Sequence, residues 1–302
     1  MNSFFQMLNV QAVLFLYLAV GCYGKKVGIL DDVAQQRLTE WVVRITLPCL
    51  VFASFHTEFR LEYLVEGAGA VAIATGMSLI ALVLGKLLYR RVPPRERCIL
   101  QYGTLVSNAG FAGLPIIAGA YGAQGLFLAS LFIIPTRVFM WSAGISLFTS
   151  MDTAERLKKV LLNPALIAVG LGLARMVLQI PLPAFVDTAI QNLGASTSPL
   201  AMALVGAMLA DLSPRAFLDK KVLYLAFVRQ ILLPFICLAG LRALGVNSLL
   251  TAVSVVLTGM PIGSTTAILA GKYGADAQFA SKCVFLSTLT SLLTVPLLTL
   301  FL

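Results

Sequence analysis

The chain consists mostly of long apolar stretches separated by short polar segments. Each stretch is about 20 residues long, the length that an α-helix needs to cross a hydrocarbon layer of ~30 Å. We therefore predict an all-α integral membrane protein with ten transmembrane helices. The predicted spans are residues 3 to 24, 41 to 56, 63 to 88, 98 to 120, 124 to 149, 160 to 179, 185 to 209, 222 to 243, 247 to 271 and 277 to 301.

Two parts of the sequence resemble each other at a distance of half the chain. Residues 104 to 123 and residues 256 to 275 both end in Ala-Gly-x-Tyr-Gly-Ala, which aligns Tyr121 with Tyr273. The segments around Pro48 and Pro199 match loosely at nearly the same offset. We interpret these matches as an internal duplication.

Each copy of the duplication holds five predicted spans. Because five is an odd number, the second copy must enter the membrane from the opposite side. We predict a 5+5 inverted repeat, with residues 1–150 as the first repeat, 151–159 as a charged cytoplasmic link and 160–302 as the second repeat. Inverted repeats are typical of secondary transporters that alternate access around a site at the bilayer midplane.

The fourth span of each repeat contains residues that interrupt helices. Proline removes a backbone donor and clashes with the preceding turn, and glycine is a poor helix former. These residues are Gly110, Gly113 and Pro115 in one span, and Pro261 and Gly263 in the other. We predict crossed discontinuous helices 4 and 9, interrupted at mid-depth where protein or a cavity satisfies the backbone. The alternative for each segment is an ordinary proline kink or close glycine packing.

Composition agrees with a membrane protein, and charge orients it. Hydrophobic residues make up 59% and charged residues 12%, against roughly 25% charged in soluble domains. The net charge of +9 comes from Lys and Arg gathered in alternate loops, such as Arg90, Arg95 and Arg97. The positive-inside rule places these loops in the cytoplasm and both termini outside. We expect a multi-pass protein of the plasma (inner) membrane, with lipid rather than nucleic acid around it.

The predicted interruptions would form an anion site. A helix that restarts within the membrane has free N–H groups and a partial positive charge at its N-terminus, which favours an anion. Asn108, Ser264 and Thr265 supply neutral donors beside them. Arg137 and Arg229 lie within spans, where an ionisable residue is a functional candidate. The alternative for both arginines is structural, with the guanidinium bound to backbone carbonyls freed by the broken helices.

The predicted substrate-binding set combines the interruptions with the two intramembrane arginines. It consists of Asn108, Gly110, Gly113, Pro115, Arg137, Arg229, Pro261, Gly263, Ser264 and Thr265. No Asp or Glu is predicted at the centre of a span, so the pattern favours an anionic substrate over a carboxylate-built cation site. Paired-carboxylate, His-Glu-x-x-His and Gly-x-Ser-x-Gly patterns are absent from the sequence. We therefore predict no enzyme activity, catalytic residue, metal ligand or cofactor.

Several motifs resemble the auxin efflux carrier family, part of the bile acid, arsenite and auxin transporter superfamily. They are residues 38 to 55, 108 to 115, 260 to 263, 272 to 276 and 287 to 296. Together they span nearly the whole chain, which is similar to compact bacterial members. The resemblance implies a scaffold of helices 1, 2, 6 and 7 that commonly forms a homodimer. It also implies a moving, elevator-like transport domain of helices 3–5 and 8–10.

The resemblance further implies organic acid anions as substrates, with Asn108 and Pro115 helping to hold the carboxylate. The chain differs from many plant exporters in lacking a long central loop, and its second interruption lacks an Asn. We expect a secondary carrier that exports a small organic acid anion by alternating access. Two alternatives remain open at this stage: a Na+-coupled organic anion symporter of the bile-acid type, and a non-transporting membrane anion receptor.

Overall fold

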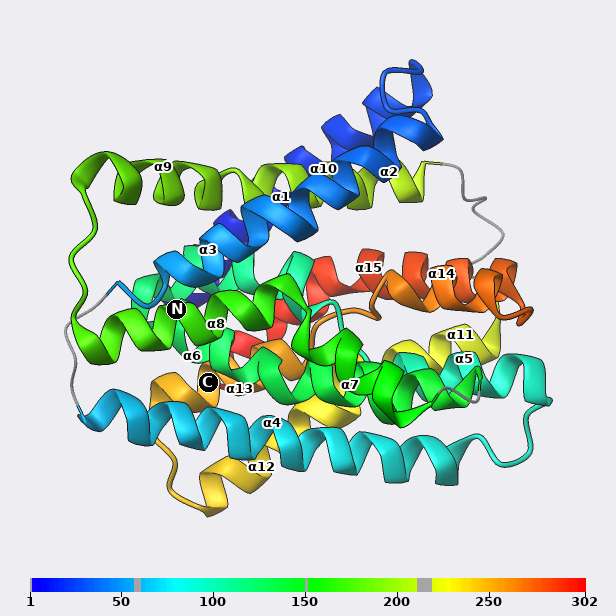
Figure 1. Ribbon diagram of the computed structural model, residues 1–302. Coiled ribbons are helices and arrows are strands. Elements are labelled where there is room, and N and C mark those ends of the chain that lie inside the picture. The colour runs from blue at the N-terminus through cyan, green and yellow to red at the C-terminus, as the bar shows by residue number, and fades with distance from the viewer. Residues whose placement is uncertain (1, 57–60, 150–151, 211–218) are drawn as a thin grey trace.

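The protein is helical throughout the part of the chain that the computed structural model describes, residues 2–56, 61–149, 152–210 and 219–302 (Figure 1). Four helical stretches in it are long and apolar enough to cross a membrane: Val65–Leu88, Ala109–Leu147, Lys220–Ala243 and Ala277–Thr299. These stretches agree with the predicted integral membrane protein. The predicted repeat boundary at residues 150 and 151 lies outside the described residues, and the ten-helix inverted repeat stays a prediction.

The first half of the chain begins with one long helix and ends with a short amphipathic one. Its elements are α1 (Asn2–Lys26), α2 (Asp32–Trp41), η1 (Val42–Thr46), α3 (Leu47–Ala53), α4 (Leu61–Leu88), α5 (Pro94–Leu105), η2 (Ala109–Gly113), α6 (Leu114–Phe139), η3 (Met140–Gly144), η4 (Ile145–Leu147) and α7 (Thr153–Leu161). The helix of the second predicted span therefore begins at Asp32 rather than at residue 41. Hydropathy misses this extension because α2 is polar and is started by Asp31, whose side chain accepts from Ala34 N–H at 2.7 Å.

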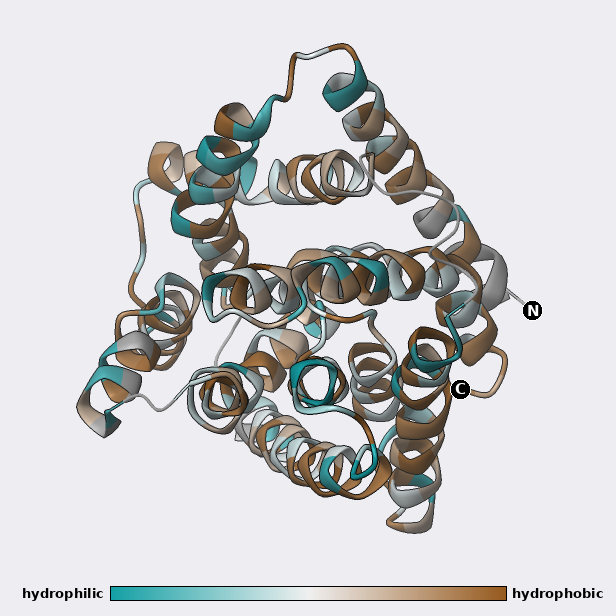
Figure 2. Ribbon diagram, turned by 90° about the vertical axis from the view of Figure 1, so that its right-hand side faces the viewer, coloured by the Kyte–Doolittle hydropathy of each residue, from teal (hydrophilic) through white to brown (hydrophobic). Residues whose placement is uncertain are grey.

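The second half of the chain ends with one long helix. Its elements are α8 (Pro164–Leu178), α9 (Ala184–Ala195), α10 (Thr197–Leu209), α11 (Lys220–Phe227), η6 (Val228–Leu232), α12 (Leu233–Ala243), α13 (Ser248–Thr258), α14 (Thr265–Lys272) and α15 (Ala277–Thr299). Hydrophilic residues gather at loops and helix ends, whereas the helix lengths are mostly hydrophobic (Figure 2).

Three π-helical turns, η1, η2 and η6, end directly before a Leu-Pro pair. Proline lacks an N–H group, and its ring collides with the carbonyl four residues earlier in an α-helix. In each case the Leu N–H instead bonds the carbonyl five residues back, as Leu233 N–H does to Val228. Such a widened turn accommodates the proline without ending the helix.

The helices α1, α2, α3, α9 and α10 form a layer over the rest of the molecule (Figures 1 and 2). Within it α1 packs along α10, and α3 packs against α9 and also against α8. The backbones of α1 and α10 touch: a Cβ at Gly21 would lie 1.9 Å from Ala203 O, and one at Gly206 would lie 1.9 Å from Leu18 O. Opposite this layer, α6 packs against α4 and α13, and α14 packs against α15.

Candidate functional site

The two helix interruptions contact each other. The helix ends at Leu105 and resumes at Ala109 in one, and ends at Thr258 and resumes at Thr265 in the other. Between them Ser107 and Ile262 form an isolated antiparallel bridge. Asn108 N–H donates to Pro261 O at 2.7 Å, and Gly263 N–H donates to Val106 O at 3.1 Å. Two segments that lie half a chain apart thus satisfy part of each other's backbone.

Side chains from neighbouring helices satisfy further backbone groups at the interruptions. Ser287 of α15 accepts from Ile262 N–H at 3.1 Å and donates to Val284 O at 3.0 Å. Arg229 of η6 donates to Thr104 O at 2.8 Å and to Met260 O at 3.3 Å. Since buried backbone groups require partners, α15 and η6 hold the interruptions in their unwound form.

The helix that restarts after the first interruption presents free backbone donors. Ala112 and Gly113 donate their N–H groups to Asn108 O, at 3.0 and 3.1 Å. The N–H groups of residues 109 to 111 have no acceptor within their own helix, because a helix leaves its first donors unpaired. This end of η2 and α6 therefore carries the partial positive charge of a helix N-terminus.

A kink at Gly122, whose backbone is non-helical with a φ of 64°, divides α6 into two helical parts. Arg137, in the second part, lies against the helix start that precedes the first. A Cβ at Gly110 would lie only 2.3 Å from Nη2 of Arg137, so the absent side chain of residue 110 makes room for the guanidinium. Among the described residues, the only hydrogen-bond acceptor of Arg137 is the sulfur of Met140, 3.4 Å from Nη1. No carboxylate of those residues pairs with it. The guanidinium is a cation with unused donors beside a positive helix end.

Polar side chains surround the meeting point of the interruptions. Asn108 is 5% exposed, and its side-chain amide makes no hydrogen bond to any residue in the described ranges. Across from it, the Thr265 hydroxyl lies 3.2 Å from the hydroxyl of Tyr102. Tyr102 is not among the predicted site residues, although it lies within the same predicted span as Asn108, one turn before the interruption.

The structure brings some of the residues predicted for the site together and separates others. Asn108, Gly110 and Arg137 gather at the first interruption, and Pro261, Gly263 and Thr265 at the second. The donors of Arg229 go to backbone carbonyls, and Gly113 packs against Leu257, whose Cδ2 would lie 2.7 Å from a Cβ at residue 113. Pro115 and Ser264 line two separate cavities.

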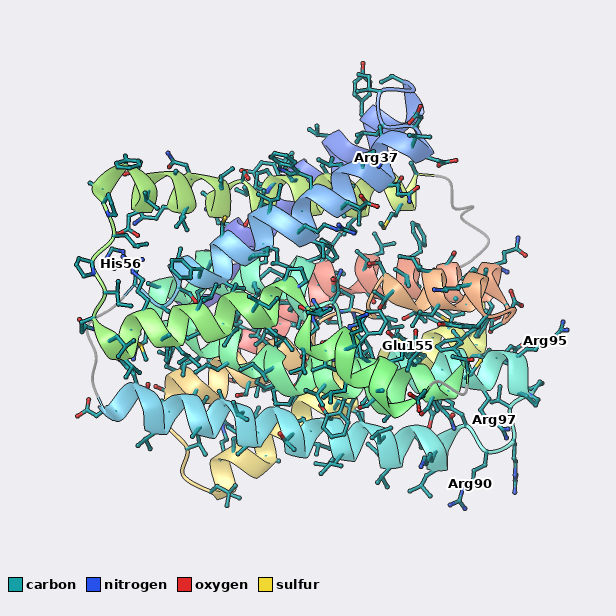
Figure 3. All side chains as sticks on the ribbon, in the orientation of Figure 1. Arg37, His56, Arg90, Arg95, Arg97 and Glu155 are labelled. Carbon is teal, nitrogen blue, oxygen red and sulfur yellow. The ribbon has the colours of Figure 1, made fainter. Side chains whose placement is uncertain are left out.

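The two cavities lie between the α1, α2, α3, α9 and α10 layer and the helices opposite. The Pro115 cavity, of about 510 Å³, is bordered by Pro115 and Gly119 on α6 and by Ser54 and Gln191 on the layer. The Ser264 cavity, of about 520 Å³, is bordered by Ser264 and by Gln36 of α2. Ser54, at the Pro115 cavity, is two residues from His56, and Gln36, at the Ser264 cavity, directly precedes Arg37. His56 and Arg37 lie at opposite ends of the molecule (Figure 3), so the two cavities lie toward opposite ends.

Comparison with known proteins places the whole chain among transporters. A family model described as a membrane transport protein matches residues 8–157 and 153–299. The chain is 25% identical to an uncharacterized transporter of Methanothermobacter thermautotrophicus, over 96% of both chains. It is 24% identical to an uncharacterized transporter of Methanocaldococcus jannaschii, over 96% of this chain and 97% of the relative. These relationships indicate a transporter and not an enzyme.

Proposed function

The chain belongs to the membrane transport protein family, as its resemblance to the auxin efflux carriers predicts, and from this premise we propose that it is a secondary carrier for a small organic acid anion. It is a multi-pass membrane protein, and the two helix interruptions support the choice of substrate. The proposed site lies where the two interruptions meet.

The observation that carries the proposal is that Arg137 has neither a carboxylate nor a backbone carbonyl as a partner among the described residues. Its guanidinium lies against Gly110, and its one acceptor among the residues described is a thioether sulfur, which is a weak acceptor. An arginine within a membrane span normally pairs with a charge or with backbone carbonyls. A carboxylate fits the planar guanidinium with two parallel hydrogen bonds, so a bound organic acid would supply the missing partner.

The other residues of the proposed site complete an anion receptor. The free N–H groups of residues 109 to 111 add the positive end of a helix. Asn108 and Thr265 supply neutral donors, and Tyr102 orients the Thr265 hydroxyl. Gly110 keeps space for the guanidinium, while Pro115, Pro261, Gly113 and Gly263 shape the interruptions, and Ser264 faces one of the two cavities.

The cavities support a mechanism of alternating access. One approaches the first interruption at Pro115 and the other approaches the second at Ser264. We propose that the layer of α1, α2, α3, α9 and α10, with α8, is the scaffold. The interrupted helices and their neighbours then move past it as a transport domain, opening one cavity and closing the other.

The distribution of charge supports an orientation in the plasma (inner) membrane. Arg37, Arg90, Arg95 and Arg97 lie at one end of the molecule, opposite His56 (Figure 3), and the positive-inside rule assigns that end to the cytoplasm. Both marked chain ends lie toward the His56 end (Figure 1). Because moving one charge is worth ~2.3 kcal/mol per 100 mV, an uncoupled anion carrier in a cell with a negative interior favours export.

Capacitive currents of the reconstituted protein on a supported membrane test this function. Concentration jumps of malate, malonate, indole acetate and acetate are applied in Na+-free buffer at fixed pH, with protein-free liposomes as the control. We expect saturable currents whose sign reports anion movement. Currents that require Na+ would replace the proposal with a Na+-coupled symporter, and saturable binding without any current would replace it with a receptor.

A further inference from the structure

Arg229 is the most completely enclosed cation at the interruptions. It lies in η6 and is 4% exposed. Its Nη1 donates to Thr104 O in the last turn of α5, and its Nε donates to Met260 O in the second interruption. Both partners are backbone carbonyls, and no carboxylate in the described ranges pairs with this guanidinium. One side chain therefore joins the interrupted helices of both halves of the chain.

Carbonyl oxygens at such a place are ligands for a small cation. The carbonyls at the end of a helix carry partial negative charge because they lack intrahelical donors. In carriers with broken helices, unwound carbonyls and half-helix ends can coordinate Na+ near the bilayer midplane. Here the oxygens of Thr104 and Met260 already have a full positive charge between them, which the protein itself provides.

The neighbours of Arg229 hold η6 in this position. Gln230 is 1% exposed, donates to Ser287 O and accepts from the Thr290 hydroxyl. Ser287 in turn binds the N–H of Ile262 in the second interruption. Two consecutive side chains of η6 are thus bonded to the interruption or to its support, so Arg229 cannot leave without disrupting this network.

We propose that Arg229 is a tethered cation, which occupies the place where a coupling cation would bind the interrupted helices, so that transport does not require Na+. The inference rests on the proposed carrier function and specifies its coupling. Arg229 acts as a positioning residue: it fixes the two interruptions relative to each other, and Arg137 remains available for the substrate.

Cation rescue of Arg229→Ala tests the proposal without any substrate. Thermal unfolding of the full chain in detergent is measured in guanidinium chloride, sodium chloride and choline chloride at equal millimolar concentration. Guanidinium fits the space left by the side chain, sodium is a small carbonyl ligand, and choline is too large. We expect Arg229→Ala to unfold at a lower temperature in choline, with at least half of the lost Tm recovered in guanidinium or sodium.

Two further variants separate this role from a general loss of packing. Arg229→Lys keeps the charge, so its Tm should not depend on which cation is present, even if Arg229→Ala fails to fold. Arg44→Ala removes an exposed arginine from another π turn, η1, and its Tm should be equal in all three salts. The wild type should behave as Arg44→Ala does.

The outcomes test the role of Arg229 independently of anion transport. It is overturned if the Tm of Arg229→Ala is equal in all three salts, if Arg229→Lys responds to sodium as strongly as Arg229→Ala, or if sodium stabilises the wild type over choline. Because no anion substrate is added, a failure of the organic anions to give currents would leave these results unchanged.

Discussion

Arg137 and Arg229 are both arginines within apolar helical stretches, yet their surroundings differ. Arg229 is almost completely enclosed and donates to two backbone carbonyls, one from each interrupted helix. Arg137 is partly exposed, lies against a glycine, and has a thioether sulfur as its one acceptor in the described part of the chain. The guanidinium therefore binds two backbone carbonyls in one place and, among the described residues, only a thioether sulfur in the other.

This difference indicates which arginine is structural. Enclosing a charge without partners is costly, so the complete enclosure of Arg229 requires the carbonyls that it binds. Arg137 is partly exposed and retains donors that a carboxylate can use. The same substitution should consequently lower stability at Arg229 and anion affinity at Arg137.

The largest expected effect is on the stability of Arg229→Met. Removal of the guanidinium leaves the Thr104 and Met260 carbonyls without these donors, and each buried unsatisfied group costs ~1–3 kcal/mol. We expect Tm to fall by several degrees in a thermal unfolding scan. The matched variant Arg137→Met should unfold close to the wild type. Equal losses of Tm in both variants would remove the distinction between the two arginines.

The next effect is on substrate affinity in Arg137→Gln. Glutamine keeps polar atoms but has no charge, and a hydrogen bond to a charged group is worth ~1.5–3 kcal/mol. We expect binding about 10- to 100-fold weaker, measured as the anion dependence of thermal unfolding. Tm without anion should change little. The anion affinity of Arg137→Lys, which keeps the charge but not the paired geometry, should lie between those of the wild type and Arg137→Gln.

A smaller effect is expected from Gly110→Ala. The new methyl group would lie 2.3 Å from Nη2 of Arg137 and would push the guanidinium away from the helix start. Affinity should fall less than in Arg137→Gln, while stability should hold because alanine is the better helix former by ~1 kcal/mol. Gly240→Ala is the control, since a Cβ there meets nothing within 4 Å. Equal affinity in both variants would show that the position of Arg137 does not matter.

The smallest effect belongs to Asn108→Ala. The Asn108 amide has no hydrogen-bond partner among the described residues, so its loss leaves no group of those residues unsatisfied. If it donates to the bound carboxylate, a loss of ~0.5–1.5 kcal/mol gives binding about 2- to 10-fold weaker. Asn108→Asp, with the same shape and a negative charge beside the anion, should weaken binding further. Affinities unchanged in both variants would exclude Asn108 from the site.

Hydropathy and helix-breaking residues predict much of the helical framework. Gly110, Gly113 and Pro115 mark the first interruption, and Pro261 and Gly263 mark the second, because these residues are poorly compatible with a continuous helix. The polar helix α2 could not be predicted as part of the second span, since its residues lack the apolar pattern on which the span prediction depends. The π turns η1, η2 and η6 each precede a Leu-Pro pair, whose effect depends on the preceding turn.

Contacts between distant segments are less predictable from the sequence. The bridge between Ser107 and Ile262 has no strand pattern, because each segment contributes only one paired residue. From their positions in the sequence, Arg137 and Arg229 are both compatible with the same two roles, recognition and carbonyl binding. The partners of Arg229 depend on how α5, η6 and the second interruption meet in space, which no local pattern encodes. The contact between Tyr102 and Thr265 likewise depends on how distant segments meet in space.

A comparison of anion affinity in the wild type and Arg137→Gln tests most directly whether Arg137 binds the substrate. The ligand is whichever of malate, malonate, indole acetate and acetate gives the largest current with the wild type. We expect binding at least about 10-fold weaker in Arg137→Gln, with an anion-free Tm equal to that of the wild type. Unchanged affinity together with a lowered Tm would contradict this expectation, because Arg137 would then support the fold and not bind the substrate.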